Sequence, residues 1–246
     1  MKRISVLMSL MLLVAVIFVG CSSTSMSPSQ KYLNELNSAY MSQDKAKIEQ
    51  AANSLSGLIV AGKSSELDYY NAALAQYKLA DYLDLQAAGG VDKSGPAEKA
   101  DDMARDYLKK AIELKPDFYD AYSLKYNVLL KKFGYVGFPR LMQYVGEISQ
   151  DLEKIKELKP NDANTKLIEG IASANNFPQP EPEETIAIFN EALKLDQKMA
   201  DAYYQIAVVQ LKNNKKDEAV TSLKKALELN PNCFWAKKKL AELEGK

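Results

Sequence analysis

Beyond its first 30 residues, the chain repeats apolar and small residues at a spacing that places them on one face of an α-helix. Ala104 and Leu108 are four residues apart, and Ala219, Leu223 and Ala226 follow one another by steps of four and three. A stripe of this kind predicts amphipathic helices, each of which must bury one side against another element. The pattern therefore predicts an all-α protein.

The helical segments are internally repeated. Four of them end alike, in Ile112–Pro116, Lys156–Pro160, Leu193–Gln197 and Leu227–Pro231. Twelve residues before each end lies a small or β-branched residue, and a large apolar residue follows four positions later. These pairs are Ala104 and Leu108, Ile148 and Leu152, Thr185 and Phe189, and Ala219 and Leu223. Copies in register at this spacing indicate a repeat protein.

The segments resemble the second helix of the tetratricopeptide repeat, with its A-x3-F spacing and closing Pro. Ala200–Cys233 matches the whole 34-residue unit, including Tyr203, Ile206 and Ala207 in its first helix. The resemblance implies a right-handed solenoid of about five helix pairs over residues 31–246, with the best repeats at 66–233 and a capping helix at 234–246. In such a stack, each pair is too small to bury its own apolar face and packs on its neighbours.

Three insertions lengthen the connections between the first and second helices of a pair, at Ala88–Lys99, Lys132–Arg140 and Asn176–Pro182. Because equivalent turns project from one edge of a stack, we expect the insertions to cluster there as loops. The Phe133–Phe138 part is unusually apolar for a loop, so it either binds a partner or folds back over exposed core. In the capping helix, we expect Lys237–Lys239 to face solvent and Trp235 to cover the end of the stack.

The N-terminus has the pattern of a secreted protein. Lys2 and Arg3 precede the apolar stretch Ile4–Val19, which as a helix would span roughly 24 Å, short of the ~30 Å hydrocarbon core of a bilayer. Phe18 to Cys21 resembles the lipobox of bacterial lipoproteins, in which the cysteine is acylated. The resemblance implies a signal peptide at 1–20, acyl chains on Cys21, a Ser-rich tether at 21–30 and a location on the periplasmic side of the envelope. Ser22 favours the outer membrane, and the alternative is an uncleaved N-terminal anchor.

Composition excludes several kinds of chemistry. The chain has no His, and its two cysteines are Cys21 and Cys233, so Cys/His zinc sites and His-activated nucleophiles cannot form. Lys and Arg total 32 against 32 Asp and Glu, which gives no basic footprint for nucleic acid. We therefore predict a chain that is not an enzyme, with no catalytic residues, no metal, no cofactor and no nucleic-acid partner.

Gly57–Ser64 reads GLIVAGKS and satisfies the phosphate-binding pattern G-x-x-x-x-G-K-[ST]. That loop needs a strand before it and a helix that begins at the Lys. Here Leu58–Ala61 continues the apolar face of a helix predicted over Asp44–Gly62, Gly62 suits the helix C-terminus, and Ser64 and Ser65 suit the next N-cap. We therefore interpret the motif as a helix-to-helix turn.

The first helices carry a second apolar face that must meet a ligand, a partner helix or another part of the chain. On the register of the repeat family, the groove-facing residues are Tyr70, Leu74, Tyr77, Ser123, Asn127, Leu167, Ile171, Tyr204 and Val208. The Lys residues with which some repeat domains hold an acidic C-terminus are missing there. We expect a lipid-anchored scaffold that binds an envelope protein, or alternatively a carrier of an apolar ligand, as in repeat lipoproteins associated with TRAP transporters. The groove is open, ligand-filled, or covered by Phe133–Phe138 or the first helix pair.

Overall fold

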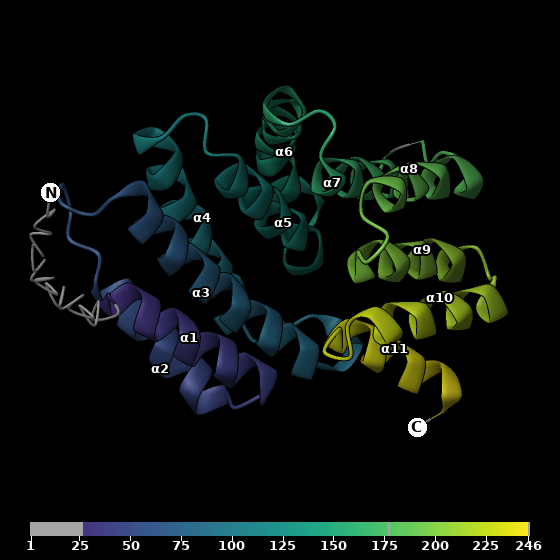
Figure 1. The fold of residues 1–246 in the computed structure, drawn as a ribbon, viewed down its shortest axis with the longest axis horizontal. Helices are drawn as coiled ribbons and strands as arrows, with labels where there is room; N and C mark the ends of the chain where they lie inside the picture. The colour runs from purple at the N-terminus through teal and green to yellow at the C-terminus, as the bar shows by residue number, and fades with distance from the viewer. Residues whose placement is uncertain (1–26, 177, 246) are drawn as a thin grey trace, which may run out of the picture.

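We analysed a computed structural model of the chain, which describes residues 27–176 and 178–245. Over these residues the chain forms eleven α-helices and one 3₁₀ turn (Figure 1). The elements are α1 Pro28–Met41, α2 Lys45–Gly57, α3 Glu66–Gln86, η1 Ala88–Gly90, α4 Pro96–Leu114, α5 Tyr119–Tyr135, α6 Phe138–Leu158, α7 Ala163–Ala174, α8 Pro182–Leu195, α9 Ala200–Lys212, α10 Lys216–Leu229 and α11 Phe234–Glu244. The predicted signal peptide and Cys21 lie outside the described residues. None of the described helices is long and apolar enough to cross a membrane.

Local sequence sets where the helices begin. The Ser65 hydroxyl accepts a hydrogen bond from the Asp68 amide, and the Asp68 carboxylate accepts one from the Ser65 amide, so the two form a capping box at α3. Pro182 stands in the first turn of α8, where its missing N–H costs nothing. Ser27 caps α1, which therefore starts at Pro28, inside the segment predicted to be a tether.

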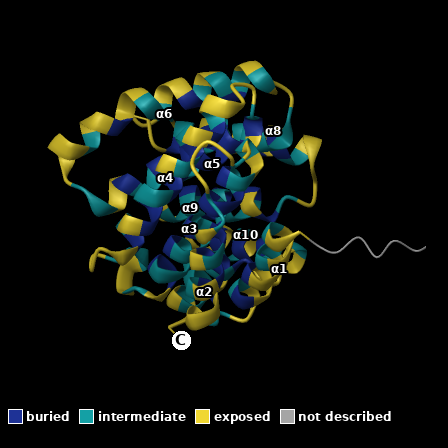
Figure 2. Cartoon of the chain, turned by 90° about the vertical axis from the view of Figure 1, so that its left-hand side faces the viewer, coloured by how far each residue is buried: buried dark blue, intermediate teal, exposed yellow. Residues whose placement is uncertain are grey.

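Ten of the helices form five antiparallel pairs, and α11 follows them, which confirms the predicted solenoid. The small and large residues of the repeat pattern lie between helices, where Ala104, Leu108, Ala219 and Leu223 are fully buried. Figure 2 shows buried positions along the inside of the stack and exposed ones around its outside. The packing of each pair on the next thus comes from the residues that the repeat pattern singled out.

The three insertions are not equivalent loops. The third insertion adds no helix of its own in its described part, Asn176 and 178–181, while Ala88–Lys99 forms η1, a short loop and the first turn of α4. The Phe133–Phe138 segment was predicted to be a loop, and this prediction was wrong. Tyr135 ends α5, Phe138 begins α6, and the extra residues lengthen both helices. Tyr135 packs against the buried cluster of Ala80, Ala97 and Ala100, whereas Phe138 is 74% exposed, so only part of this segment covers core.

The GLIVAGKS segment is a turn between α2 and α3, although α2 ends earlier than predicted. Gly57 is its last helical residue, so Leu58–Ala61 does not continue the helix. Ile59 instead packs against the core cluster around Tyr69 and Ala73. Gly62 has a φ of 73°, the left-handed conformation that glycine accepts at no steric cost.

The stack curves until its end meets its beginning. We describe the stack as an N-terminal half (α1–α6) and a C-terminal half (α7–α11). Tyr126 of α5, Ile155 of α6 and Ile168 of α7 share one buried core cluster where the two halves meet. In Figure 1, the yellow α11 returns to the C-terminal end of α3, and residue contacts join these two helices. The two halves are therefore joined at two places, by the core that α5, α6 and α7 share and again where α11 reaches α3.

Candidate functional site

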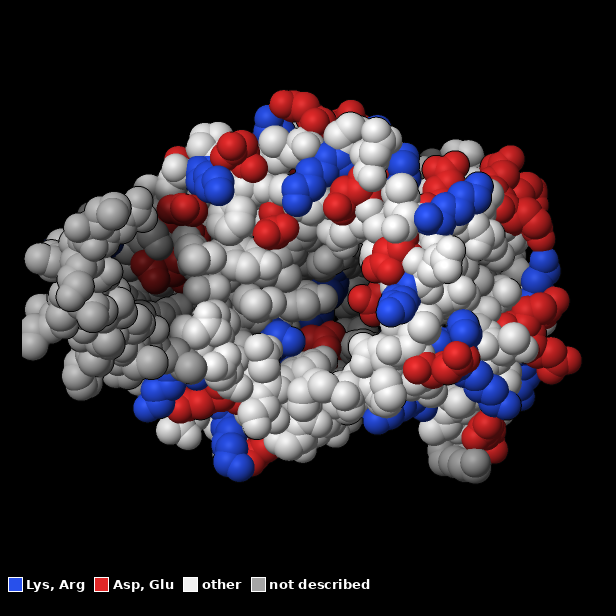
Figure 3. Space-filling view, viewed as in Figure 1, with Lys and Arg blue, Asp and Glu red and all other residues white. Residues whose placement is uncertain are grey.

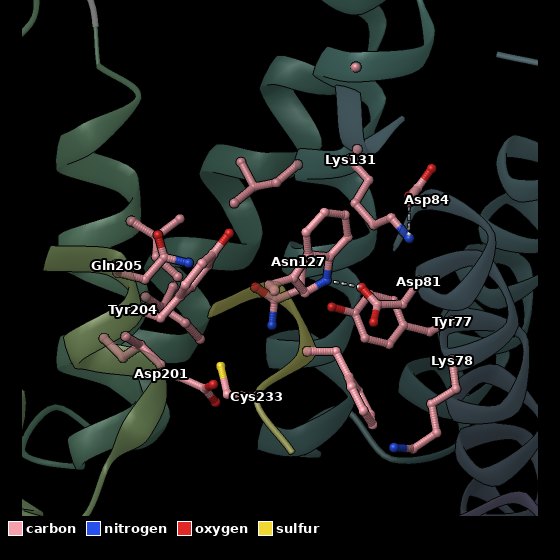
Figure 4. Close-up of a pocket in the computed structure, with 18 of the residues that line it drawn as sticks. Tyr77, Lys78, Asp81, Asp84, Asn127, Lys131, Asp201, Tyr204, Gln205 and Cys233 are labelled. Atoms are coloured by element: carbon pink, nitrogen blue, oxygen red, sulfur yellow. Dashed lines mark hydrogen bonds and ion pairs between the residues drawn. The ribbon is translucent and has the colours of Figure 1, made fainter. Parts of the chain in front are cut away.

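A cavity of about 660 Å³ lies between the two halves. Figure 3 shows it as a hollow at the centre of one face, with blue and red atoms of charged side chains inside it. Its walls are α3 and α5 on one side and α7, α9 and the start of α11 on the other (Figure 4). The labelled residues of its lining are Tyr77, Lys78, Asp81, Asp84, Asn127, Lys131, Asp201, Tyr204, Gln205 and Cys233. The lining mixes aromatic, amide and charged groups, so it differs from the apolar surface expected from the sequence.

Five of the nine predicted groove residues come together in this cavity. They are Tyr77, Asn127, Leu167, Ile171 and Tyr204, which the first helices α3, α5, α7 and α9 contribute. The shared orientation of the first helices, which the repeat register predicted, is the reason why these residues converge.

The other four predicted groove residues do not line the cavity. Tyr70 and Leu74 pack against the core cluster of α3, α4 and α5, and the Tyr70 ring centroid lies 5.2 Å from that of Phe118. Ser123 is buried and its hydroxyl has no hydrogen-bond partner among the described residues, while Val208 is half-buried. The groove therefore narrows at its N-terminal end, because the connection from α4 to α5 places Phe118 over the first turns of α3.

The contacts that close the ring were not predicted. The Trp235 indole donates a hydrogen bond to Asp81 Oδ1 at 2.9 Å, and Asp81 also accepts one from the Tyr40 hydroxyl. Lys238 Nζ donates to the carbonyl oxygens of Leu85 at 2.5 Å and Ala87 at 2.7 Å. A cation at the C-terminal end of α3 is favoured by the helix dipole and satisfies carbonyls that have no helical partner. Lys238 was expected to face solvent, and that prediction was wrong.

We call this set of contacts the seam. Aromatic packing extends it, because the rings of Tyr40 and Phe234 meet edge to face with centroids 5.7 Å apart. Gly90 of η1 faces Trp235, and a Cβ at Gly90 would lie 3.0 Å from the indole. The insertion after α3 and the first residues of α11 thus fit against each other. The only sequence signal for the seam was one Trp in a short terminal helix, and that signal does not identify a partner.

A buried ion cluster supports the α3–α5 wall. Lys131 Nζ lies 2.9 Å from Asp84 Oδ2 and 3.2 Å from Asp101 Oδ2, and the Tyr135 hydroxyl donates to both carboxylates. Burial works to lower the pKa of Lys131, but the two carboxylates outweigh it and raise that pKa overall. Burial raises the pKa of Asp101 to about 6, against the lowering effects of Lys131 and Tyr135. One lysine therefore balances two acids whose side chains are almost inaccessible to water.

A second cluster joins α5 to α6 and α4. Lys125 Nζ lies 3.0 Å from Asp151 Oδ1 and 3.2 Å from Glu147 Oε1, and Glu147 also pairs with Arg105. Burial raises the pKa of Asp151 to about 6 despite Lys125. For Glu147, burial works to raise the pKa, but Arg105 and Lys125 outweigh it and lower the pKa overall. These charges fix the middle helices without contributing to the cavity.

We expect the protein to become more stable as pH falls from 7.5 to about 5. Asp101 and Asp151 have raised pKa values near 6, so their stabilising contribution is complete below the unfolded value of about 3.9 and is lost as pH rises through 6. In Asp101→Asn, this gain should shrink by about 1 kcal/mol, because one of the two groups no longer titrates and only one pH unit of the window lies below its pKa. Urea unfolding at pH 5 and pH 7.5 measures it, and an equal gain in both proteins would contradict the assignment.

Cavity chemistry favours binding. The described residues contain no group of three or more His, Cys, Asp or Glu side chains that could hold a metal ion. Burial raises the pKa of the Cys233 thiol, with a smaller lowering effect from the Ala236 amide and further increases from Asp201 and Asp81. A thiol with a raised pKa is a weak nucleophile at neutral pH. The amides of Asn127 and Gln205, in contrast, are placed to contact a bound group.

Comparison with known proteins identifies the repeat. Residues 200–233 match the tetratricopeptide repeat family. The fold is a tetratricopeptide-repeat solenoid. It is similar to the crystal structure of TTC0263, a thermophilic TPR protein of Thermus thermophilus, with a TM-score of 0.62 and 17% identity over 87% of this chain and 100% of that one. A comparison with curated proteins found no match.

Two further solved structures are less similar. MamA of Desulfovibrio magneticus RS-1 has a TM-score of 0.46 and 18% identity, over 85% of this chain and 99% of its own. YrrB, described as a TPR protein with an unusual peptide-binding site, has a TM-score of 0.40 and 18% identity, over 86% of this chain and 98% of its own. Of the structures compared, the TTC0263 structure supports the fold, and at 17% identity it supports the fold alone.

Proposed function

We propose that this TPR solenoid is a non-catalytic scaffold of the bacterial cell envelope, anchored by acyl chains on Cys21, that takes a segment of a protein partner into its central cavity. The observation that carries the proposal is the cavity itself, where equivalent faces of four first helices converge. TPR solenoids present such concave surfaces for binding. A volume of about 660 Å³ accommodates a few residues of an extended segment or one compact side chain with its neighbours.

Site-specific crosslinking tests whether the partner protein binds in the cavity. Asn127 and Gln205 line the cavity and make no side-chain hydrogen bond to the described residues, so a photoreactive residue at either position disturbs little. We expect each to capture the same protein from intact envelopes. Lys224 is exposed on α10, away from the cavity, and serves as the matched control. Equal capture at Lys224, or none at the two cavity positions, contradicts the proposal.

The second candidate function is the handling of a small ligand. It is favoured by the seam, because α11 closes the side of the groove through which a long partner would otherwise continue. The volume also lies in the usual range for small-molecule sites, ~300–1,000 Å³. Denaturing the purified protein and analysing the released compounds by mass spectrometry distinguishes the two. A stoichiometric organic compound would favour ligand handling.

Lipid anchoring is tested separately. Cys21 follows an apolar stretch and Gly20, and several acyl chains at ~0.8 kcal/mol per buried CH₂ would make membrane attachment stable. We expect Cys21→Ala to accumulate as an unprocessed precursor, while the unchanged protein partitions into detergent. Mature, soluble protein from Cys21→Ala would contradict the anchoring and would leave the cavity proposal intact.

A further inference from the structure

The two walls of the cavity differ in how their charges are balanced. On the α3–α5 wall, Lys131 pairs with Asp84 and Asp101, and its ammonium lies 5.2 Å from the Tyr77 ring centroid. Lys78, on the same wall, lies 4.5 Å from the ring centroid of Tyr40. This wall therefore already holds two ammonium groups against aromatic faces, an arrangement stabilised by the negative face of the ring.

The α9 wall has the same kinds of group, but the described residues place no cation against them. Asp201, Tyr204 and Gln205 are consecutive or nearly consecutive on α9 and all three line the cavity. In Figure 4, the Asp201 carboxylate points toward the cavity. The residue is exposed, so a ligand can reach it from solvent, and its carboxylate has no hydrogen bond or ion pair within the described part of the chain. Neither does the Tyr204 hydroxyl or the Gln205 amide. A carboxylate and an amide oxygen beside an aromatic ring can accept hydrogen bonds from an alkylammonium or guanidinium group and place its charge near the ring face.

The negative field in the cavity comes from both walls. Asp81 faces Asp201 from α3, and its hydrogen-bond donors are neutral, the Tyr40 hydroxyl and the Trp235 indole. The pKa of Asp201 is raised, first because surrounding protein displaces water from the carboxylate and second because of the charge on Asp81. The pKa of Tyr204 is also raised, by burial first and then by these and neighbouring negative groups. A cation between the walls would relieve this repulsion.

We infer that the group bound in the cavity carries a positive charge, an alkylammonium or guanidinium, and that Asp201 is its anchor. The inference rests on the proposed function and adds the chemistry of the ligand to it. Such a cation can be the Lys or Arg side chain of a protein segment or the end of a free amine. Lys78 lies on the opposite wall, where its positive charge repels a cationic ligand group. The positive group of the ligand therefore binds at α9.

The test uses the full chain in detergent, with Trp235 as the reporter, because it is the only Trp in the sequence and lines the cavity. The probes are N-acetyl-lysine N′-methylamide, the norleucine analogue that lacks the ammonium group, and n-pentylammonium. Fluorescence titration and calorimetry are run at pH 7.5. We expect the lysine probe to bind at least roughly tenfold more tightly than the norleucine probe, as for a hydrogen bond to a charged group.

Asp201→Asn should remove most of this preference. Asp217→Asn makes the same change on the exposed start of α10, outside the cavity, and should retain it. A lysine probe that binds more tightly than n-pentylammonium indicates a protein segment as the source, and equal binding indicates a free amine. Equal binding of the lysine and norleucine probes, no binding of the lysine probe, or an unchanged preference in Asp201→Asn overturns the inference. Crosslinking of a partner at Asn127 or Gln205 would then still support the proposed function.

Discussion

Replacing Lys131 by Met should lower the free energy of unfolding by about 3–5 kcal/mol at pH 7.5. The substitution keeps the aliphatic stem but leaves Asp84 and Asp101, whose side chains are 4% and 0% exposed, without their cation. An unpaired carboxylate in a protein interior costs far more than the net value of the pair itself. Chemical denaturation monitored by circular dichroism measures the loss.

Two controls make this result specific. Lys110→Met removes a lysine whose pair with Glu113 is 57% and 61% exposed, and it should change stability by less than about 0.5 kcal/mol. The deficit of Lys131→Met should also shrink below pH 6, because Asp101 then takes up a proton and no longer needs a cation. A deficit that stays the same at pH 5 would show that lost packing, rather than charge, causes the effect.

Gly170→Ala should destabilise the protein by about 1–3 kcal/mol. Gly170 lies in α7, and a Cβ there would come within 2.9 Å of three carbons of the Phe189 ring. Phe189 is fully buried in the cluster that joins α7, α8 and α9, so its ring has no free space to move into. Thermal denaturation should therefore show a lower melting temperature, although Ala is the better helix former.

Gly146→Ala is the matched control for this change. Gly146 is also inside a helix, α6, but a Cβ there would meet nothing within 4 Å among the described residues. It should stabilise the protein by up to about 1 kcal/mol, because Ala restricts the unfolded chain and favours the helix. Stabilisation by both substitutions would contradict the close packing of α7 against Phe189.

The sequence was sufficient to predict the core of the stack, because that core depends on local spacing. Ala219 and Leu223 face the neighbouring helix because positions four apart share one side of a helix. The residues at the same two positions of the other repeats are predicted in the same way. The same regularity brought Tyr204 and Leu167 to the cavity. Tyr70 failed as a groove residue because its surroundings depend on Phe118, which lies in a connection outside the repeat pattern.

The end of α5 and the start of α6 were harder to predict. The Lys132–Arg140 insertion was expected to be a loop because it lengthens the repeat, yet Gly134 lies in the last turn of α5 and Pro139 in the first turn of α6. A Cβ at Gly134 would lie 3.1 Å from Val91, so this glycine permits a close helix contact rather than a bend. The sequence pattern alone cannot distinguish these two roles of glycine.

The seam could not be predicted for a different reason. Asp81 and Trp235 are 154 positions apart, and their contact depends on small rotations summed over four helix pairs. Each pair resembles an ordinary repeat, so no single segment carries the information that the ring closes. Lys238 likewise looked like a solvated lysine until the end of α3 was placed beside it.

A distance measurement across the seam tests the central claim, that the solenoid closes around its cavity. Spin labels are attached to cysteines introduced by Gln86→Cys, at the last residue of α3, and Lys237→Cys on α11, on either side of the seam. Cys233 is replaced by Ser, so that it is not labelled. We predict one narrow, short distance distribution, which becomes longer and broader in Trp235→Ala as the bond to Asp81 is lost. A long, broad distance distribution in the labelled protein that keeps Trp235 would contradict the closed ring.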